Sequence, residues 1–113
     1  MRKAIVYLNL DAVGTLTETS QGYVFQYDER YIAQPNARAL SLTLPISSQA
    51  FSSTHLFSFF YGLLSEGYNR ALQCRLLKID ENDDFGLLLA IAHTDTIGAV
   101  RIVAQTQNQG VEV

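Results

Sequence analysis

Residues 22–28 read GYVFQYD, and this alternating stretch constrains the fold more than any other part of the sequence. Tyr23, Phe25 and Tyr27 recur with a period of two, which places the three aromatic rings on one face of a β-strand. The strands expected before it are joined by links of only a few residues, which are too short for parallel crossovers. The first quarter of the chain therefore predicts an antiparallel β-meander.

Two strands precede this stretch and a fourth is expected after it. Residues 3–9 and 12–18 are rich in β-branched and aromatic side chains, and Gly14 marks a possible β-bulge in the second of them. Residues 39–44 read ALSLTL and predict a fourth strand with its three leucines on one face. Pro45 would end that strand, because proline has no N–H group to donate to a sheet.

The pattern then becomes helical. A helix is expected from near His55 to about Leu64, with Ser52, Ser53 or Thr54 as its N-cap residue. Its apolar residues surround nearly the whole circumference, which indicates a helix that is buried on most sides.

Two more helices and a closing strand complete the expected order. They span residues 68–78, 82–92 and 97–104, and the carboxylates of Asp80 and Asp83 provide a start signal for the last helix. The fold class is therefore α+β, an antiparallel meander packed with three short helices and a closing C-terminal strand. In the first of these helices we expect an apolar face formed by Tyr68, Leu72, Leu76 and Ile79, with Arg70, Arg75 and Lys78 solvated.

The 113 residues suit one domain, expected over 1–104, followed by a flexible polar tail over 105–113. Charged residues make up 17% of the chain, against about 25% in a typical domain. Such a surface is compatible with an apolar interface. The net charge is −3 and Lys and Arg form no cluster, so direct nucleic-acid binding has little electrostatic support. A single cysteine, no signal-peptide pattern and no apolar run near the ~20 residues of a membrane span favour a cytoplasmic protein.

The sequence offers no convincing catalytic or metal-binding constellation. His55 and His93 lie in no zinc-binding spacing, and both suit helix ends. Cys74 has no CxxC partner and is expected to be a buried structural thiol. The carboxylates of 80–84 lack the ligand spacing of an EF-hand and suit helix capping. We therefore expect no enzyme activity, no metal and no cofactor, which points toward a binding or regulatory role.

Several stretches taken together resemble the N-terminal subdomain of HipA-type kinases. The similarity covers about residues 3–103 and depends on five motifs in the right order at the right spacing. They are VYLNLDAVGTL at 6–16, GYVFQYDERYI at 22–32, ALSLTLPIS at 39–47, FFYGLLSEG at 59–67 and DFGLLLAIAHTDTIGAV at 84–100. Two positions depart from the family pattern, since Ser65 replaces a proline and Tyr68 replaces a common tryptophan.

The resemblance implies a role as a partner of a kinase. The chain has no room for a catalytic loop, a metal-binding aspartate or an ATP site, so it is not expected to be a kinase itself. A freestanding subdomain of this kind resembles the HipS group of three-gene HipBST toxin–antitoxin systems. That group implies an antitoxin that inhibits a HipT-type serine/threonine kinase, docking on its N-lobe near the ATP site and the glycine-rich loop. A HipB-type helix-turn-helix protein would supply DNA binding in a ternary complex.

The residues expected to contact the kinase lie at the end of the first helix and in the turn that follows it. Tyr68 is the expected plug of the kinase site, because aromatic anchors are common hot spots of interfaces. The other expected partner-binding residues are Phe60, Tyr61, Leu64, Ser65, Glu66 and Gly67. Many apolar residues of this helix, Phe57, Phe59 and Leu63 above all, are also expected in the core.

Two alternatives stay open. The chain could be a non-inhibitory structural or assembly module that bridges the kinase and a HipB-type protein. A small enzyme with an unrecognised site is the third hypothesis, against which the lack of paired catalytic groups argues.

Overall fold

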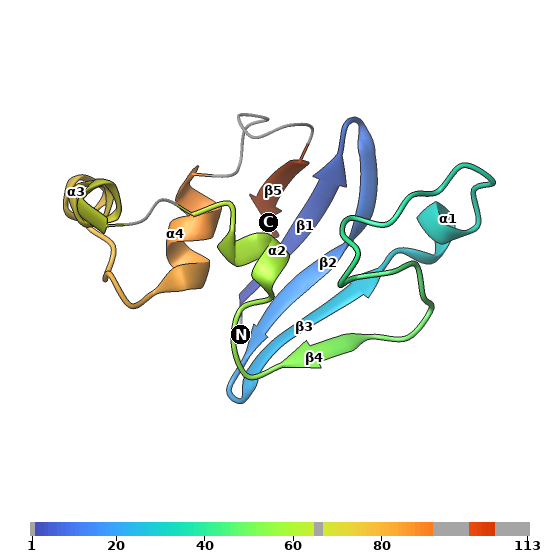
Figure 1. The fold of residues 1–113 in the computed structure, drawn as a ribbon, viewed down its shortest axis with the longest axis horizontal. Coiled ribbons are helices and arrows are strands. Elements are labelled where there is room, and N and C mark those ends of the chain that lie inside the picture. Colours follow the sequence, from blue (N-terminus) through green and yellow to red (C-terminus); the bar gives the residue numbers. More distant parts are fainter. Residues whose placement is uncertain (1, 65–66, 92–99, 106–113) are drawn as a thin grey trace, which may run out of the picture.

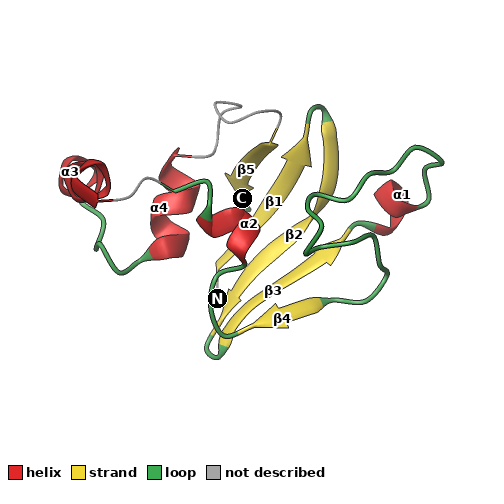
Figure 2. Ribbon diagram, in the orientation of Figure 1, coloured by secondary structure: helices red, strands yellow, loops and turns green. Residues whose placement is uncertain are grey.

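A computed structural model describes residues 2–64, 67–91 and 100–105. These residues form an antiparallel sheet of five strands in the order β4-β3-β2-β1-β5, with four helices (Figures 1 and 2). The predicted α+β class is confirmed. The strands are β1 (Arg2–Leu8), β2 (Asp11–Thr19), β3 (Gly22–Tyr27), β4 (Phe51–Ser53) and β5 (Val100–Ala104), and the helices are α1 (Glu29–Ile32), α2 (Ser58–Tyr61), α3 (Gly67–Leu77) and α4 (Asp84–Ile91).

The predicted bulge near Gly14 is confirmed. Val6 pairs with Gly14 and the next residue, Tyr7, pairs with Ala12, so Val13 is the extra residue of β2. A Cβ atom on Gly14 would lie 2.5 Å from the carbonyl oxygen of Gln26 and 2.8 Å from the ring of the neighbouring phenylalanine. Only glycine fits at this point, because the meander brings β3 so close to β2.

The core lies between one face of the sheet and helices α2 and α4. Residues that are paired on neighbouring strands lie on the same face of the sheet. Leu16 of β2 pairs with Ala4 of β1 and with Phe25 of β3, and all three side chains are fully buried. Phe60 of α2 packs on Phe25, with the ring centroids 5.7 Å apart. Helix α4 contacts both β5 and α2, as its place beside them in Figure 1 indicates. Its contribution to the core consists of Phe85, Leu87 and Leu88, all fully buried.

The predicted strand over 39–44 is wrong. This segment forms turns, with a single bridge between Ser41 and Leu44, and Leu42 is fully exposed whereas Leu44 is buried. The reason is that tyrosine hydroxyl groups, and not a neighbouring strand, satisfy its backbone. Tyr27 Oη donates to the carbonyl of Leu44 and accepts the N–H of Leu40 at 2.9 Å. The fourth strand lies instead at β4, which pairs with β3 and which the sequence did not predict.

The predicted helix over 55–64 is shorter than expected. Helix α2 spans only Ser58–Tyr61, because Ser53, one of the expected caps, lies in β4 and its hydroxyl accepts the N–H of His55 at 3.2 Å. After α2 the chain continues with three-residue turns, in which the N–H groups of Leu63 and Leu64 reach back to Phe60 and Tyr61. The short α1 was also not predicted; the side chain of Asp28 caps it by accepting the N–H of Arg30.

The helix predicted over 68–78 matches α3, but its exposed and buried faces differ from the prediction. Leu76 is 71% exposed and Leu77 46% exposed, whereas Cys74 is 2% exposed, as expected for a structural thiol. Arg70 was expected in solvent, yet its side chain is only 14% exposed and forms an ion pair. The prediction is therefore wrong for Leu76 and Arg70, whereas Ile79 packs against the core and Arg75 and Lys78 are exposed as expected.

The last predicted elements are found within the described residues, and α4 begins at Asp84 instead of residue 82. Helix 82–92 corresponds to α4 and strand 97–104 to β5, while residues 92–99 lie outside the described part of the chain. Of the predicted tail 105–113, the structure describes only the first residue. Within the described ranges, no helix is long and apolar enough to cross a membrane.

Candidate functional site

The predicted docking segment begins at the C-terminal end of α2. Tyr61 is the last residue of the helix and is 44% exposed, and Gly62 follows as the exposed C-cap residue. Phe60 is fully buried and Leu64 is 7% exposed, so neither side chain is available to a partner in this conformation. These two residues anchor the segment to the core, and Tyr61 is the residue that it presents on the surface.

The rest of the predicted segment is described only in part. Ser65 and Glu66 lie outside the described residues. Gly67 and Tyr68 are the first two residues of α3, but the structure describes no side chain for Tyr68. The expected plug therefore starts the helix that follows the turn, and its contacts stay a prediction.

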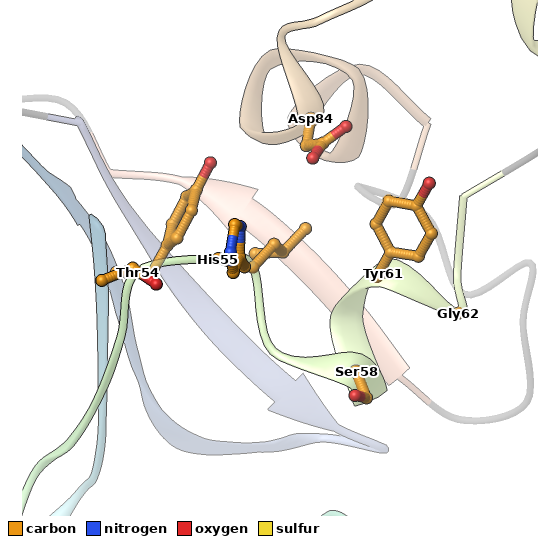
Figure 3. A pocket seen from close by; sticks show the side chains of 8 residues that line it. Thr54, His55, Ser58, Tyr61, Gly62 and Asp84 are labelled. Carbon is orange, nitrogen blue, oxygen red and sulfur yellow. The ribbon is translucent and has the colours of Figure 1, made fainter. Parts of the chain in front are cut away.

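A hollow beside Tyr61 is lined by residues of β3, the loop after β4, α2 and α4. Its volume is about 410 Å³. Figure 3 shows Ser58 and Asp84 on opposite sides of this hollow, with His55 and Tyr61 flanking it. The residues that line it include Tyr23, His55, Leu56, Ser58, Tyr61 and Asp84.

Asp84 reaches the hollow because the local sequence starts a helix there. Asp83 caps α4, since its side chain accepts the N–H of Gly86 at 3.0 Å. Asp84 is then the first residue of the helix, and its Oδ1 accepts a hydrogen bond from Nη2 of Arg70 at 2.5 Å. The same nitrogen donates to the carbonyl of Glu81 at 2.6 Å, so this arginine joins α3 to the start of α4.

A second arginine fixes α4 to the sheet. The guanidinium of Arg2 binds both carboxylate oxygens of Glu18 on β2 and both oxygens of Asp83. Its carbon also lies 5.3 Å from the ring centroid of Phe85. The hydrogen bonds from Arg2 lower the pKa of Asp83, against the opposing effect of burial. The wall of the hollow that carries Asp84 is therefore held by ion pairs on both sides.

The lining of the hollow fits a binding surface better than a catalytic site. Ser58 and His55 both line it, but no hydrogen bond joins them in the described part of the chain, so the nucleophile and base of a hydrolase are not assembled there. Residues 2–64, 67–91 and 100–105 hold no group of three His, Cys, Asp or Glu side chains that could bind a metal ion. What the hollow does offer is two aromatic rings and one carboxylate.

Sequence reasoning missed this hollow. Tyr23 and Asp84 are 61 positions apart in the sequence, and His55 was considered only as a helix-end residue. The alternation of 22–28 did place Tyr23 on the same face as Phe25 and Tyr27, and the capping signal did place carboxylates at the start of α4. Only the shortening of α2 brings the loop carrying His55 between them.

Comparison with known proteins gives consistent results. The family model of the HipA N-terminal domain matches residues 4–103. A solved structure of the N-terminal domain of HipA toxin superposes with a TM-score of 0.72 at 28% identity, covering 96% of each chain. These matches confirm the resemblance to the HipA N-terminal subdomain.

Two curated relatives place this domain in different settings. An uncharacterized protein of Haemophilus influenzae is 34% identical over 107 residues, which cover 95% of this chain and 96% of the relative. A candidate kinase of Sinorhizobium fredii, Y4mE, is 31% identical over 96 residues, which cover 84% of this chain but only 23% of that longer protein. The family model, the fold and both relatives agree, and the chain belongs to the HipA N-terminal domain family.

Proposed function

We propose that this chain is an antitoxin that binds a HipT-type serine/threonine kinase and holds it inactive. The observation that carries the proposal is the pair of relatives. A protein named as a candidate kinase contains a segment similar to this chain within a chain about four times longer, whereas the Haemophilus influenzae relative has nearly the same extent as this one. A domain that packs on a kinase when fused to it retains the matching surface when it is a separate protein.

The docking surface is formed by the end of α2 and the start of α3. Tyr61 supplies an exposed ring, and Phe60 and Leu64 on either side of it in the sequence are buried in the core. Ser65, Glu66, Gly67 and Tyr68 complete the proposed set of contact residues, with Tyr68 as the aromatic plug. Aromatic side chains lose little conformational entropy on binding and dominate many interfaces. A kinase needs its glycine-rich loop to close over ATP, so a domain seated beside that loop stops phosphoryl transfer.

The test is a phosphorylation assay with the kinase encoded beside this chain, purified with and without the chain. We expect a stoichiometric complex without kinase activity, and activity after the chain is removed. Tyr68→Ala and Tyr61→Ala should each weaken inhibition by about tenfold or more, the loss expected when an interface anchor is truncated. Leu42→Ala is the matched control, because Leu42 is fully exposed in the loop between α1 and β4 and should leave inhibition unchanged.

Two other results would change the conclusion. A kinase that binds the chain but stays active in the complex would assign an assembly role, with the chain bridging the kinase and a HipB-type DNA-binding protein. A kinase that does not bind the chain would refute the proposal.

A further inference from the structure

We propose that the hollow between Tyr23, Tyr61 and Asp84 receives a lysine or arginine side chain of the partner kinase. This inference rests on the proposed function for the identity of the partner. It adds the chemistry of the contact, which the family assignment does not specify.

The shape of the hollow suits one long basic side chain. Its volume of about 410 Å³ leaves room for such a side chain, and Tyr61, which lines it, is exposed. Tyr23 and Leu56 offer apolar surface to the methylene stem of such a side chain. Aromatic faces also attract cations, and the carboxylate of Asp84 stands across the hollow from Ser58 (Figure 3).

The charges around the hollow favour a cation. The nearby arginines, Arg2 and Arg70, are already engaged in ion pairs with Glu18, Asp83 and Asp84. These five groups carry one net negative charge, and Oδ2 of Asp84 accepts no hydrogen bond from a side chain in the described residues. Burial, and then the charges of Glu18, Asp84 and Asp83, raise the pKa of Tyr23, consistent with a negative potential at the wall.

An anion fits the hollow less well. The start of α4 would attract one, but the carboxylate of Asp83 already accepts the N–H of Gly86 there. An incoming phosphate or carboxylate would also meet the charge of Asp84. The hollow is continuous with the docking segment through Tyr61 and Gly62, so a protein seated on that segment covers its mouth.

Charge variants of His55 test this assignment. His55 lines the hollow and is exposed, so its replacement leaves the core intact. Relative to His55→Gln, we expect His55→Lys to weaken binding of the purified kinase by about five- to tenfold and His55→Glu to strengthen it by a similar factor at low salt. Both effects should shrink at about 0.5 M salt because free ions screen the charges. Gln34→Lys and Gln34→Glu are the matched controls, since Gln34 is exposed and follows α1 by two residues, and α1 lies at the opposite end of the molecule from α3 (Figure 1).

The outcomes separate this inference from the proposed function. If the kinase binds the native chain but the two charge variants of His55 bind equally well, the cation site is refuted and the antitoxin role stands. If the kinase does not bind, the antitoxin role fails. The site is then judged by NMR with acetyl-arginine amide and its neutral analogue, acetyl-citrulline amide. Saturable shifts at Tyr61 and Gly62 with the arginine compound alone support a cation site, and equal shifts, or none, refute it.

Discussion

The hydroxyl group of Tyr27 takes the place of a strand partner for the loop between α1 and β4. It bonds the backbone of Leu40 and of Leu44, and Tyr31 does the same for both backbone groups of Arg38, with distances of 2.7 and 2.9 Å. Burial raises the pKa of Tyr27, and the hydrogen bond from the N–H of Leu40 opposes this effect. Two phenols thus fix a loop that has the composition of a strand.

Removing one of these hydroxyl groups should destabilise the protein measurably. Tyr27→Phe keeps the ring but leaves the N–H of Leu40 and the carbonyl of Leu44 without that partner. We expect the free energy of unfolding to fall by about 1–3 kcal/mol, the cost of buried polar groups left unpaired. Urea denaturation measures the loss, and hydrogen exchange at Leu40 should accelerate. Tyr23→Phe is the control, because the hydroxyl of Tyr23 has no hydrogen-bond partner in the described residues; an equal loss in both variants would contradict this account.

Among the elements, α3 departs most from its predicted packing. Leu76 and Leu77 lie at its exposed end, and Figure 1 shows the helix at the edge of the molecule, on the opposite side of the sheet from α1. The helix ends where Lys78 adopts a left-handed conformation with φ of 60° and the N–H of Ile79 bonds the carbonyl of Cys74 at 2.8 Å. This is the Schellman arrangement, in which glycine is the usual residue.

A glycine at position 78 should therefore stabilise the end of α3. A side chain in the left-handed region costs about 1 kcal/mol, and glycine avoids that cost. We expect Lys78→Gly to unfold at a higher urea concentration than Lys78→Ala, by about 0.5–1 kcal/mol in free energy. The alanine variant is the proper reference because both changes remove the same charge from the helix end. Equal stability of the two variants would show that the left-handed turn is not maintained in solution.

At the scale of the whole molecule, Arg2 joins the sheet to the helical layer. It pairs with Glu18 on β2 and with Asp83 at the start of α4, at 2.7 Å in each case. The pKa of Asp83 is lowered from its ordinary value of 3.8, first by the hydrogen bond from Arg2. A carboxylate with a depressed folded-state pKa stabilises the protein at pH values above its unfolded-state pKa. That contribution is lost as the pH falls through the lower folded-state value.

Replacing Arg2 should thus lower the free energy of unfolding most at neutral pH. We expect Arg2→Gln to lower the free energy of unfolding by about 1 kcal/mol at pH 7, a modest value because the three side chains are partly exposed and solvent screens them. The difference from the native chain should shrink progressively as the pH falls below 3.8 and Asp83 becomes protonated. Arg38→Gln is the control, since Arg38 is exposed and uses only its backbone in the described hydrogen bonds. A difference that stays constant with pH would contradict the role of Asp83.

The sequence predicted those parts of the molecule that depend on local pattern. The alternation of aromatic residues in 22–28 predicted the meander, Gly14 predicted the bulge, and the carboxylates at 80–84 predicted the start of α4. The segment 39–44 has the same alternation as a strand, and no local rule reveals that the hydroxyl group of Tyr27 bonds the backbone of Leu40 and Leu44. The hollow depends on residues from three elements and the loop after β4, so it could not be predicted before the length of α2 was known.

The pairing of β1 with β5 has a consequence for how the protein is made. Ala4 pairs with Ala104, a hundred residues further along the chain. A ribosome therefore releases the first strand long before its outer neighbour exists, and closing so long a loop is slow. Until residues 100–104 emerge, the open edge of β1 is free to pair with other nascent chains. Newly made protein thus completes its sheet only after residues 100–104 have been translated, and a product truncated before Val100 would be prone to aggregation.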